Sequence, residues 1–285
     1  MKRSFETKDP ASRPNKKRPP SHNLFLESYG VRIQISSNRT VAVDAIRDML
    51  PANLAHNFEE SSELSDAHHF TYEWNDDGVD SLYENGEWVS VNRDRRELLG
   101  ALATRIRLTV AEFATERVFV HAGVVAVNGK AIIIPGKSHS GKTTLVAELV
   151  RRGAVYYSDE YAVFDSDGRV HPFTKPLSIR QEGKSDQLDT EVEKLGGRSG
   201  TDPLTVGLIV FTKFEANAKW RPKHVNVAKG VLELIRDTIP IRRSPRFTMS
   251  VLNSIAGTAT LIKSKRGEAA DTAPLIFSFM RDPYD

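Results

Sequence analysis

The stretch "IIIPGKSHSGKTT", residues 132–144, decides how the rest of this sequence is interpreted. An apolar run is followed by Gly136, four mixed residues, and then Gly141, Lys142 and Thr143. This spacing is G-x-x-x-x-G-K-[ST], the pattern of a phosphate-binding P-loop between a strand and a helix. The apolar residues before the loop and the amphipathic segment after it supply the strand and the helix that the pattern requires. A chance match on a surface turn is the alternative.

The loop predicts a binding site for a nucleoside triphosphate. In such loops successive backbone N–H groups surround the phosphate oxygens, and the positive end of the following helix points at the same place. Lys142 is expected to reach the terminal phosphates, and the Thr143 hydroxyl to hold Mg²⁺. We expect the ligand to contact Gly136, Lys137, Ser138, His139, Ser140, Gly141, Lys142, Thr143 and Thr144.

Two acidic residues form the second candidate element. In "VYYSDEYAVF", residues 155–164, an expected apolar strand leads into Asp159 and Glu160. Acids at the end of a strand beside a P-loop commonly bind the metal or position the nucleophile. Asp159 lies only seventeen residues after Lys142, which favours a compact kinase-type core. The alternative is that the two acids only begin a surface turn.

His121 is the third candidate. It lies in "VFVHAGVVAV", fifteen residues before Gly136, within a segment 118–136 that we interpret as three strands. The "NGK" at 128–130 predicts a hairpin turn, and pairing of the strands on either side would bring His121 near the loop. A lone histidine is more often a structural residue, so both interpretations stay open.

The segments around this core predict a small α+β unit before it and more α/β structure after it. We expect a strand over 29–35, a short helix ended by Pro51, and a longer helix from Arg95 to Glu116 with one buried stripe. We expect helices over 142–151, ended by Gly153, and over 228–239, and a strand in 204–214 that is buried on both faces. The polar, glycine-rich segment 180–202 is expected to be a mobile active-site segment or disordered.

Composition narrows the classes of protein. The chain has no cysteine, which excludes disulfides, cysteine-ligated zinc and a cysteine nucleophile. No apolar run approaches the ~20 residues that cross a bilayer, and the first residues do not resemble a secretory signal. Residues 1–20 carry a net charge of +5, whereas the whole chain carries +3. Residues 21–285 therefore carry a net charge of 3 − 5 = −2. We therefore expect a soluble, cytoplasmic protein with a disordered basic tail over 1–22, without a membrane partner and without a nucleic-acid partner.

The segments "HAGVV", "NGKAIIIPGKSHSGKTTLVAELVRRGA" and "YYSDEYAV" together resemble the catalytic domain of HPr kinase/phosphorylase and its related kinases. The resemblance lies in the order of these motifs and is good over residues 118–180. It implies an α/β P-loop kinase core of the HPr kinase and phosphoenolpyruvate carboxykinase type. We accordingly divide the chain into the tail 1–22, a small N-terminal α+β domain over 23–116, and an HPr kinase-like nucleotide-binding domain over 117–285.

The resemblance also implies an activity and roles. ATP with Mg²⁺ would donate its γ-phosphate to a hydroxyl of a protein, peptide or small molecule, and a homo-oligomer fits the same resemblance. The catalytic residues would be Asp159 as the base that takes the acceptor's proton, His121 beside the transferred phosphate, and Lys142. The metal site would comprise Thr143, Asp159 and Glu160. Of the cations in "KPLSIR", we expect Arg180 rather than Lys175 to contact phosphate.

Several departures from the family pattern matter. His139 stands where the family's loop has its middle glycine, Thr143 replaces the final serine, and Glu160 replaces the second aspartate. The family's downstream motifs are not evident after residue 180, so neither HPr as substrate nor the reverse phosphorolysis is expected. Two further readings stay open: a non-catalytic ATP-binding regulatory module, and a nucleic-acid factor that uses the basic tail, which would bind with strong salt dependence.

Overall fold

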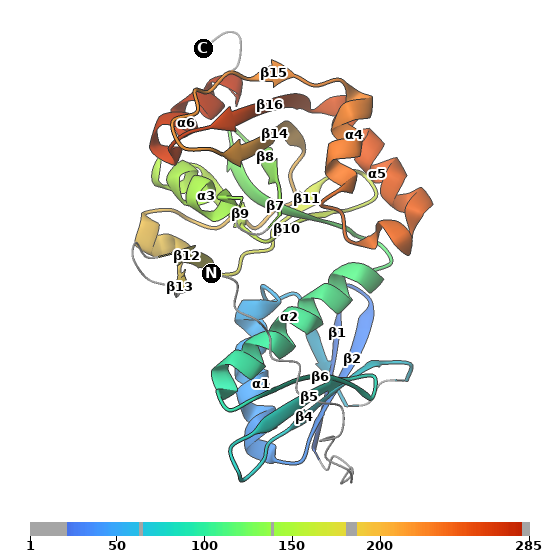
Figure 1. Ribbon diagram of the computed structural model, residues 1–285. Helices are drawn as coiled ribbons and strands as arrows, with labels where there is room; N and C mark the ends of the chain where they lie inside the picture. The colour runs from blue at the N-terminus through green and yellow to red at the C-terminus, as the bar shows by residue number, and fades with distance from the viewer. Residues whose placement is uncertain (1–21, 63–64, 138–139, 181–186, 281–285) are drawn as a thin grey trace.

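The computed structural model describes residues 22–62, 65–137, 140–180 and 187–280, with the side chains of Arg180, Gln187 and Leu188 left out (Figure 1). The chain is a mixed α/β protein with two large mixed sheets and a small two-stranded sheet. This architecture is compatible with an α/β nucleotide-binding fold. The expectations for the basic tail, apart from residue 22, and for Ser138 and His139 lie outside the described residues.

The N-terminal sheet has six strands in the order β3-β1-β2-β4-β5-β6. Alternate residues of β1 and β2 are buried, which defines the face on which both helices of this half pack. Among the described strand pairs of this sheet, β2 and β4 are parallel and the others are antiparallel. The elements are β1 His22–Ser28, β2 Val31–Ser37, α1 Thr40–Asn53, β3 Glu59–Ser61, β4 His68–Glu73, β5 Asp80–Glu84, β6 Glu87–Asn92 and α2 Arg95–Phe113.

Two local predictions in this half were wrong. The strand predicted over 29–35 begins instead at Val31, because Tyr29 and Gly30 have positive φ and turn β1 back as a hairpin. Helix α1 does not end at Pro51 but continues to Asn53. Leu50 and Leu54 are both buried, and their packing holds the last turn although Pro51 cannot donate a hydrogen bond.

The C-terminal sheet has eight strands, with β11-β10-β7-β8-β14-β16-β15 in order and β9 paired to β7. The central strands β8, β14 and β16 are parallel, and β14 lies between the other two, as expected for a strand buried on both faces. The strands are β7 Val118–Val127, β8 Lys130–Pro135, β9 Val155–Ser158, β10 Tyr161–Phe164, β11 Val170–His171, β14 Val206–Phe214, β15 Lys223–His224 and β16 Thr260–Arg266. The small sheet pairs β12 Leu177–Arg180 with β13 Gln187–Thr190.

Helices cover both faces of this sheet (Figure 1). Helices α3 Lys142–Arg151 and α6 Ala269–Phe277 pack on one face, and their buried residues form one core cluster. Helices α4 Val227–Ile235 and α5 Pro245–Thr258 belong to the cluster on the other face. Short 3-10 turns complete the chain, namely η2 Val192–Leu195, η3 Pro240–Arg242 and η4 Ser278–Met280. The bounds predicted for α3, and Gly153 just after its end with φ +100°, are confirmed.

Strand β7 is longer than expected, because residues 118–136 form two strands and not three. It runs without interruption through Gly123, whose missing side chain lets α3 approach closely. A Cβ at this position would lie 2.5 Å from Val146 Cγ2. The hairpin at "NGK" is confirmed, with positive φ at Asn128 and Gly129 and a regular antiparallel ladder to β8.

The two halves of the chain share an apolar core. Phe119, on β7, packs edge-on against Tyr29 of the N-terminal half with ring centroids 5.2 Å apart. The same ring meets Tyr161 at 5.7 Å and Phe173 at 6.4 Å. Phe119, Tyr161 and Phe173 belong to the hydrophobic cluster that fills the N-terminal half, and Tyr29 packs against this cluster. The core of the first half therefore extends into the second sheet.

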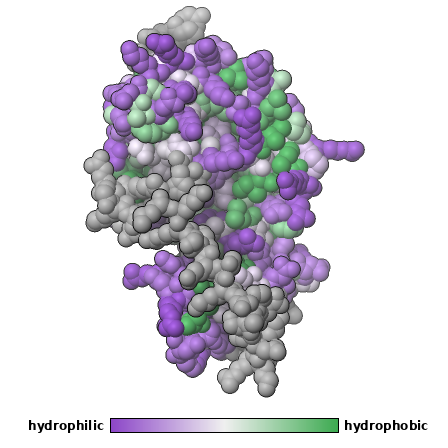
Figure 2. All heavy atoms as spheres, in the orientation of Figure 1, coloured by the Kyte–Doolittle hydropathy of each residue, from purple (hydrophilic) through white to green (hydrophobic). Residues whose placement is uncertain are grey.

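The surface in Figure 2 is mostly hydrophilic, with apolar residues gathered over the α4 and α5 side of the C-terminal half. On α4, Val227 and Leu232 are exposed. Within the described residues, none of the helices combines the length and the hydropathy that crossing a bilayer requires.

Phe119→Ala is expected to lower the free energy of unfolding by about 3–5 kcal/mol, because it removes a fully buried ring shared by both halves. Urea denaturation followed by tryptophan fluorescence measures this loss. Trp88→Ala is the control, since Trp88 is exposed on β6 and its removal should change stability by no more than about 0.5 kcal/mol. Equal effects of the two substitutions would contradict a shared core.

Candidate active site

Residues 136–141, which begin the G-x-x-x-x-G-K-[ST] spacing, lie between the carboxyl end of β8 and the amino end of α3. Gly141 is the N-cap of α3 with φ +84°, and it offers no side chain to the helix. A Cβ at Gly141 would lie 2.6 Å from Arg266 Nη2, so both the backbone angle and the space require glycine. The first N–H groups of α3 lack intrahelical acceptors and carry the positive end of the helix dipole. The segment thus provides the donors that an anion needs.

Lys142 is buried and folds back onto this segment. Its Nζ donates to the carbonyl oxygens of Gly136, at 2.5 Å, and of Lys137, at 3.0 Å. Burial lowers the pKa of Lys142, and the charges of Glu160, Asp237 and Asp159 oppose that shift. The ammonium group therefore sits within the field of three carboxylates at the mouth of the loop.

His121 lies beside the loop, on β7. Its Nδ1 is 2.9 Å from the carbonyl oxygen of Gly136 and 3.2 Å from Lys142 Nζ. A carbonyl only accepts, so we assign the ring hydrogen to Nδ1, which leaves Nε2 as an acceptor 3.9 Å from Glu160 Oε1. Burial, and then the charge of Lys142, lower the pKa of His121 to about 4 against the opposing effect of Glu160. The imidazole is neutral at neutral pH.

Asp159 and Glu160 directly follow the end of β9, as predicted, and a second strand, β10, begins directly after them. Both strands pair with β7. The ladder keeps one register across the break, from Ser158 opposite Val124 to Tyr161 opposite His121. The Ser158 hydroxyl accepts hydrogen bonds from the N–H groups of Glu160 and Tyr161 and fixes the bend. The break places the two neighbouring acids against different partners.

Asp159 faces α3. It is buried, and it accepts a hydrogen bond from Tyr156 Oη at 3.3 Å. Burial raises the pKa of Asp159 and Glu160 adds to the rise, while Lys175, the nearby Thr143 hydroxyl and Tyr156 oppose it. Two oxygen groups that suit Mg²⁺, the Asp159 carboxylate and the Thr143 hydroxyl, are therefore near each other.

Glu160 faces the opposite way, toward α2. Its Oε2 lies 3.4 Å from Lys175 Nζ, and both side chains are largely buried. Burial alone would raise the pKa of Glu160, but Lys175, Arg107 and His121 together outweigh it and lower the pKa. Glu160 is thus an ionised carboxylate among cations at the junction between the two halves of the chain.

Several residues of this site were missed by the sequence analysis. Lys175 contacts Glu160, whereas the side chain of Arg180, the residue preferred from the sequence, lies outside what the structure describes. Arg107 comes from α2 and Asp237 from the segment after α4, and neither belongs to a motif. Burial raises the pKa of Asp237, which Lys142 and Lys137 partly offset. Only a three-dimensional arrangement reveals these residues.

Arg266 is a further buried cation next to the loop. It donates through Nη2 to the carbonyl oxygen of Gly141 at 2.7 Å and through Nη1 to that of Gly267 at 2.9 Å. Its Cζ lies 5.4 Å from the centroid of the Phe214 ring, and burial lowers its pKa. Arg266 fixes the orientation of the peptide at the start of α3, which makes it a positioning residue for the loop.

The donors present fit a triphosphate with Mg²⁺. The first N–H groups of α3 lack intrahelical acceptors, and the Ser140 hydroxyl is buried without a hydrogen-bond partner among the described residues. No group of three or more acids or histidines able to hold a metal occurs in the described parts of the chain. Mg²⁺ in phosphate sites takes one or two carboxylates plus phosphate oxygens, so Thr143 with Asp159 is sufficient.

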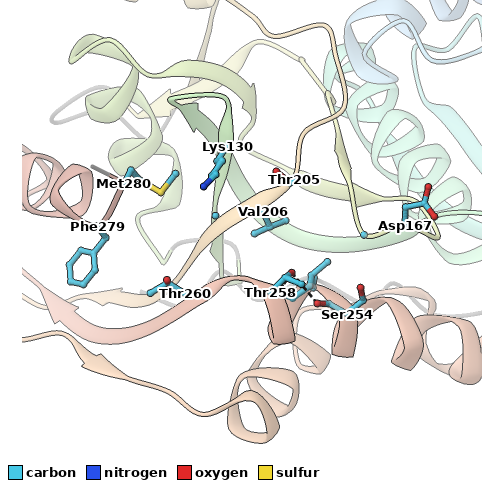
Figure 3. Close-up of a pocket in the computed structure, with 12 residues that line it drawn as sticks. Lys130, Asp167, Thr205, Val206, Ser254, Thr258, Thr260, Phe279 and Met280 are labelled. Carbon is cyan, nitrogen blue, oxygen red and sulfur yellow. Dashed lines mark hydrogen bonds between the residues drawn. The ribbon is translucent and has the colours of Figure 1, made fainter. Parts of the chain in front are cut away.

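Of two hollows in the described part of the chain, one is lined by residues of this site and the other is not. A cleft of about 410 Å³ is lined by His121, Lys137 and Glu160 together with residues of α2 and the segment after α4. The larger cavity, about 520 Å³, lies where β8, β14 and β16 begin, with Lys130, Val206 and Thr260 on its wall (Figure 3). Ligands of parallel α/β sheets bind outside the carboxyl ends of the strands. The smaller cleft is therefore the one that belongs to the site.

Comparison with known proteins gives a distant likeness. No protein-family model matches the chain, and no curated protein matches it. Among solved structures, the Hpr(Ser) kinase/phosphatase from Coxiella burnetii is similar with 14% sequence identity and a TM-score of 0.30. The match covers 57% of this chain and 88% of the other. Similarity at this level transfers no activity and no residue role, so the proposal below rests on the geometry of the site.

Lys175→Met is expected to destabilise the fold by about 3 kcal/mol, because it leaves the largely buried Glu160 carboxylate without its ion-pair partner. Urea denaturation at pH 7 gives the value. In the double variant Lys175→Met/Glu160→Gln, at least half of that loss should be recovered. Additive losses would show that the two side chains do not interact.

Proposed function

We propose that the protein is an ATP- and Mg²⁺-dependent kinase that transfers the γ-phosphate to an acceptor hydroxyl. One observation carries the proposal: a P-loop segment with its lysine, a Thr143–Asp159 oxygen pair and an ionised Glu160 beside a cleft meet at the amino end of α3. In this proposal residues 117–285 carry the nucleotide site, and residues 23–116 form the opposite wall of the cleft.

The loop residues would bind the phosphates. The N–H groups at the start of α3 and the Ser140 hydroxyl donate to phosphate oxygens, and Lys142 exchanges the carbonyls of Gly136 and Lys137 for the terminal phosphates. Thr143 and Asp159 would hold Mg²⁺, which supplies charge neutralisation at the β- and γ-phosphates. Arg266 holds the loop through its hydrogen bond to the carbonyl oxygen of Gly141. Positioning and charge stabilisation then account for most of the rate.

The division of work between the two acids follows from their surroundings. Asp159 lies near Thr143 and is buried away from the cleft, so we assign it to the metal. Glu160 lines the cleft, so we assign it the acceptor's proton, and His121 borders the same part of the cleft. The family resemblance gives Asp159 the role of base and Glu160 a role at the metal, and the variants below separate the two assignments.

Lys142→Ala is expected to weaken ATP binding about ten- to hundred-fold, since one charge-assisted contact to phosphate is lost. Isothermal titration calorimetry with ATP and Mg²⁺ measures the Kd. Lys130→Ala is the matched control, because this lysine lies at the amino end of β8, away from the loop. Unchanged affinity in Lys142→Ala would contradict the phosphate site.

Asp159→Asn is expected to raise the Mg²⁺ concentration needed for half-maximal turnover by at least ten-fold. Glu160→Gln should lower kcat by about 10²-fold with little change in that Mg²⁺ requirement, as for loss of a general base. Magnesium titrations of ADP release distinguish the two. The opposite pattern would assign the role of general base to Asp159, as the resemblance implies.

The proposal as a whole is tested with γ-labelled ATP, Mg²⁺, purified protein and an extract of the source cells, beside Glu160→Gln. Label on a macromolecule or metabolite that is absent with the variant would establish a kinase. Label found only in free phosphate would establish a hydrolase. ATP binding without turnover would favour a non-catalytic regulatory module and overturn the proposal.

A further inference from the structure

The cleft beside Glu160 is formed by both halves of the chain. Thr104 and Leu108 of α2 make one wall, and the backbone turn 236–239 after α4 makes another. The floor consists of His121, Glu160 and Tyr161, which adjoin each other across β7 and β10. The cleft is therefore bordered by both His121 and Glu160.

The size of the cleft indicates what it can take. Its volume of about 410 Å³ lies toward the lower end of the ~300–1,000 Å³ typical of small-molecule sites. Leu108, 38% exposed, contributes an apolar patch, and Thr104 and Thr238 add hydroxyls. Apolar surface with a few convergent polar groups suits a small organic molecule.

The charges around the cleft are unequally paired. Glu160 is paired with Lys175, and Arg236 with Glu233 at 3.1 Å. Among the residues that the structure describes, no hydrogen bond or ion pair reaches the Asp237 carboxylate. The charges of Lys142, Lys137 and Arg236 act on it at longer range, and the charge of Glu233 opposes them. Both lysines belong to the loop proposed to bind phosphates. With triphosphate bound, their charge is directed to phosphate oxygens. Asp237 then keeps one nearby cation, Arg236, which is itself paired with Glu233.

We propose that this cleft is the acceptor site of the kinase and that it takes a small hydroxyl-bearing amine, with the ammonium group at Asp237 and the hydroxyl at Glu160 and His121. This inference rests on the proposed function. The acceptor oxygen forms a bond to the γ-phosphorus, and the bond from that phosphorus to the β–γ bridging oxygen breaks. The bond's electron pair stays on ADP, and the hydroxyl proton passes to Glu160. ATP and the amino alcohol thus give ADP, a phosphate monoester and one proton.

The test uses three matched three-carbon diols that differ in charge: 3-amino-1,2-propanediol, glycerol and glycerate. Each is incubated with ATP, Mg²⁺ and the full chain, and the phosphate monoester is followed by ³¹P NMR beside acceptor-independent ADP release. The amine should be phosphorylated at least ten-fold faster, in kcat/KM, than either other diol. Asp237→Asn should reduce that preference to less than about three-fold.

Two tryptophan variants test the location of the site. Leu108→Trp fills the cleft and should raise the KM for the amine at least ten-fold while the Kd for ATP stays the same. Arg96→Trp, an exposed position on the same helix, should change neither. Circular dichroism and the unfolding midpoint verify that both variants fold.

The outcomes separate the inference from the function on which it rests. Loss of ATP binding or turnover in the unaltered chain would overturn both. With ATP bound and turned over, a preference for glycerol or glycerate would overturn the assigned charge of the acceptor. Unaltered kinetics in Leu108→Trp would overturn the site itself, and so would transfer to protein acceptors only.

Discussion

The antiparallel pairing of β7 with β8 on one side and with β9 and β10 on the other is the constraint on which the rest of this structure depends. It brings His121 to the loop that follows β8. It also holds Asp159 and Glu160 between β9 and β10, next to Tyr161, the residue that pairs with His121. The same strand carries Gly123, against which α3 packs, and Phe119, which joins the N-terminal core. A shift of β7 by one residue would move every one of these groups to the wrong face of the sheet.

The site also concentrates charge beneath the surface. Lys142, Asp159 and Lys175 are each less than a tenth exposed, and Arg266 is more deeply buried still. Removing such groups from water is costly, and each one here is compensated by carbonyl oxygens or by an opposite charge. Hydrophobic side chains of equal volume would serve stability as well or better. The stability of the fold therefore gives no reason for this network, whereas the proposed binding site does.

The sequence was most informative where structure is decided by near neighbours. The bounds of α3, the turn at Asn128–Gly129 and the glycine after α3 depend on local backbone angles and helix ends, and these were predicted. The nearness of His121 to the loop followed from the hairpin. Arg107, Lys175, Asp237 and Arg266 could not be found this way, because long-range packing alone brings them to the site.

The shared core around Phe119 has a consequence for how the chain can be divided. A fragment that begins at residue 117 would keep the loop, both acids and His121. It would therefore contain all the residues of the nucleotide site that the sequence predicts. It would also present Phe119, Tyr161, Val163 and Phe173 to water, since these side chains complete the core of the first half. Contiguous aromatic surface of this kind drives self-association. The two halves are therefore best regarded as one folding unit with two sheets, and expression of the second alone would yield an aggregating protein.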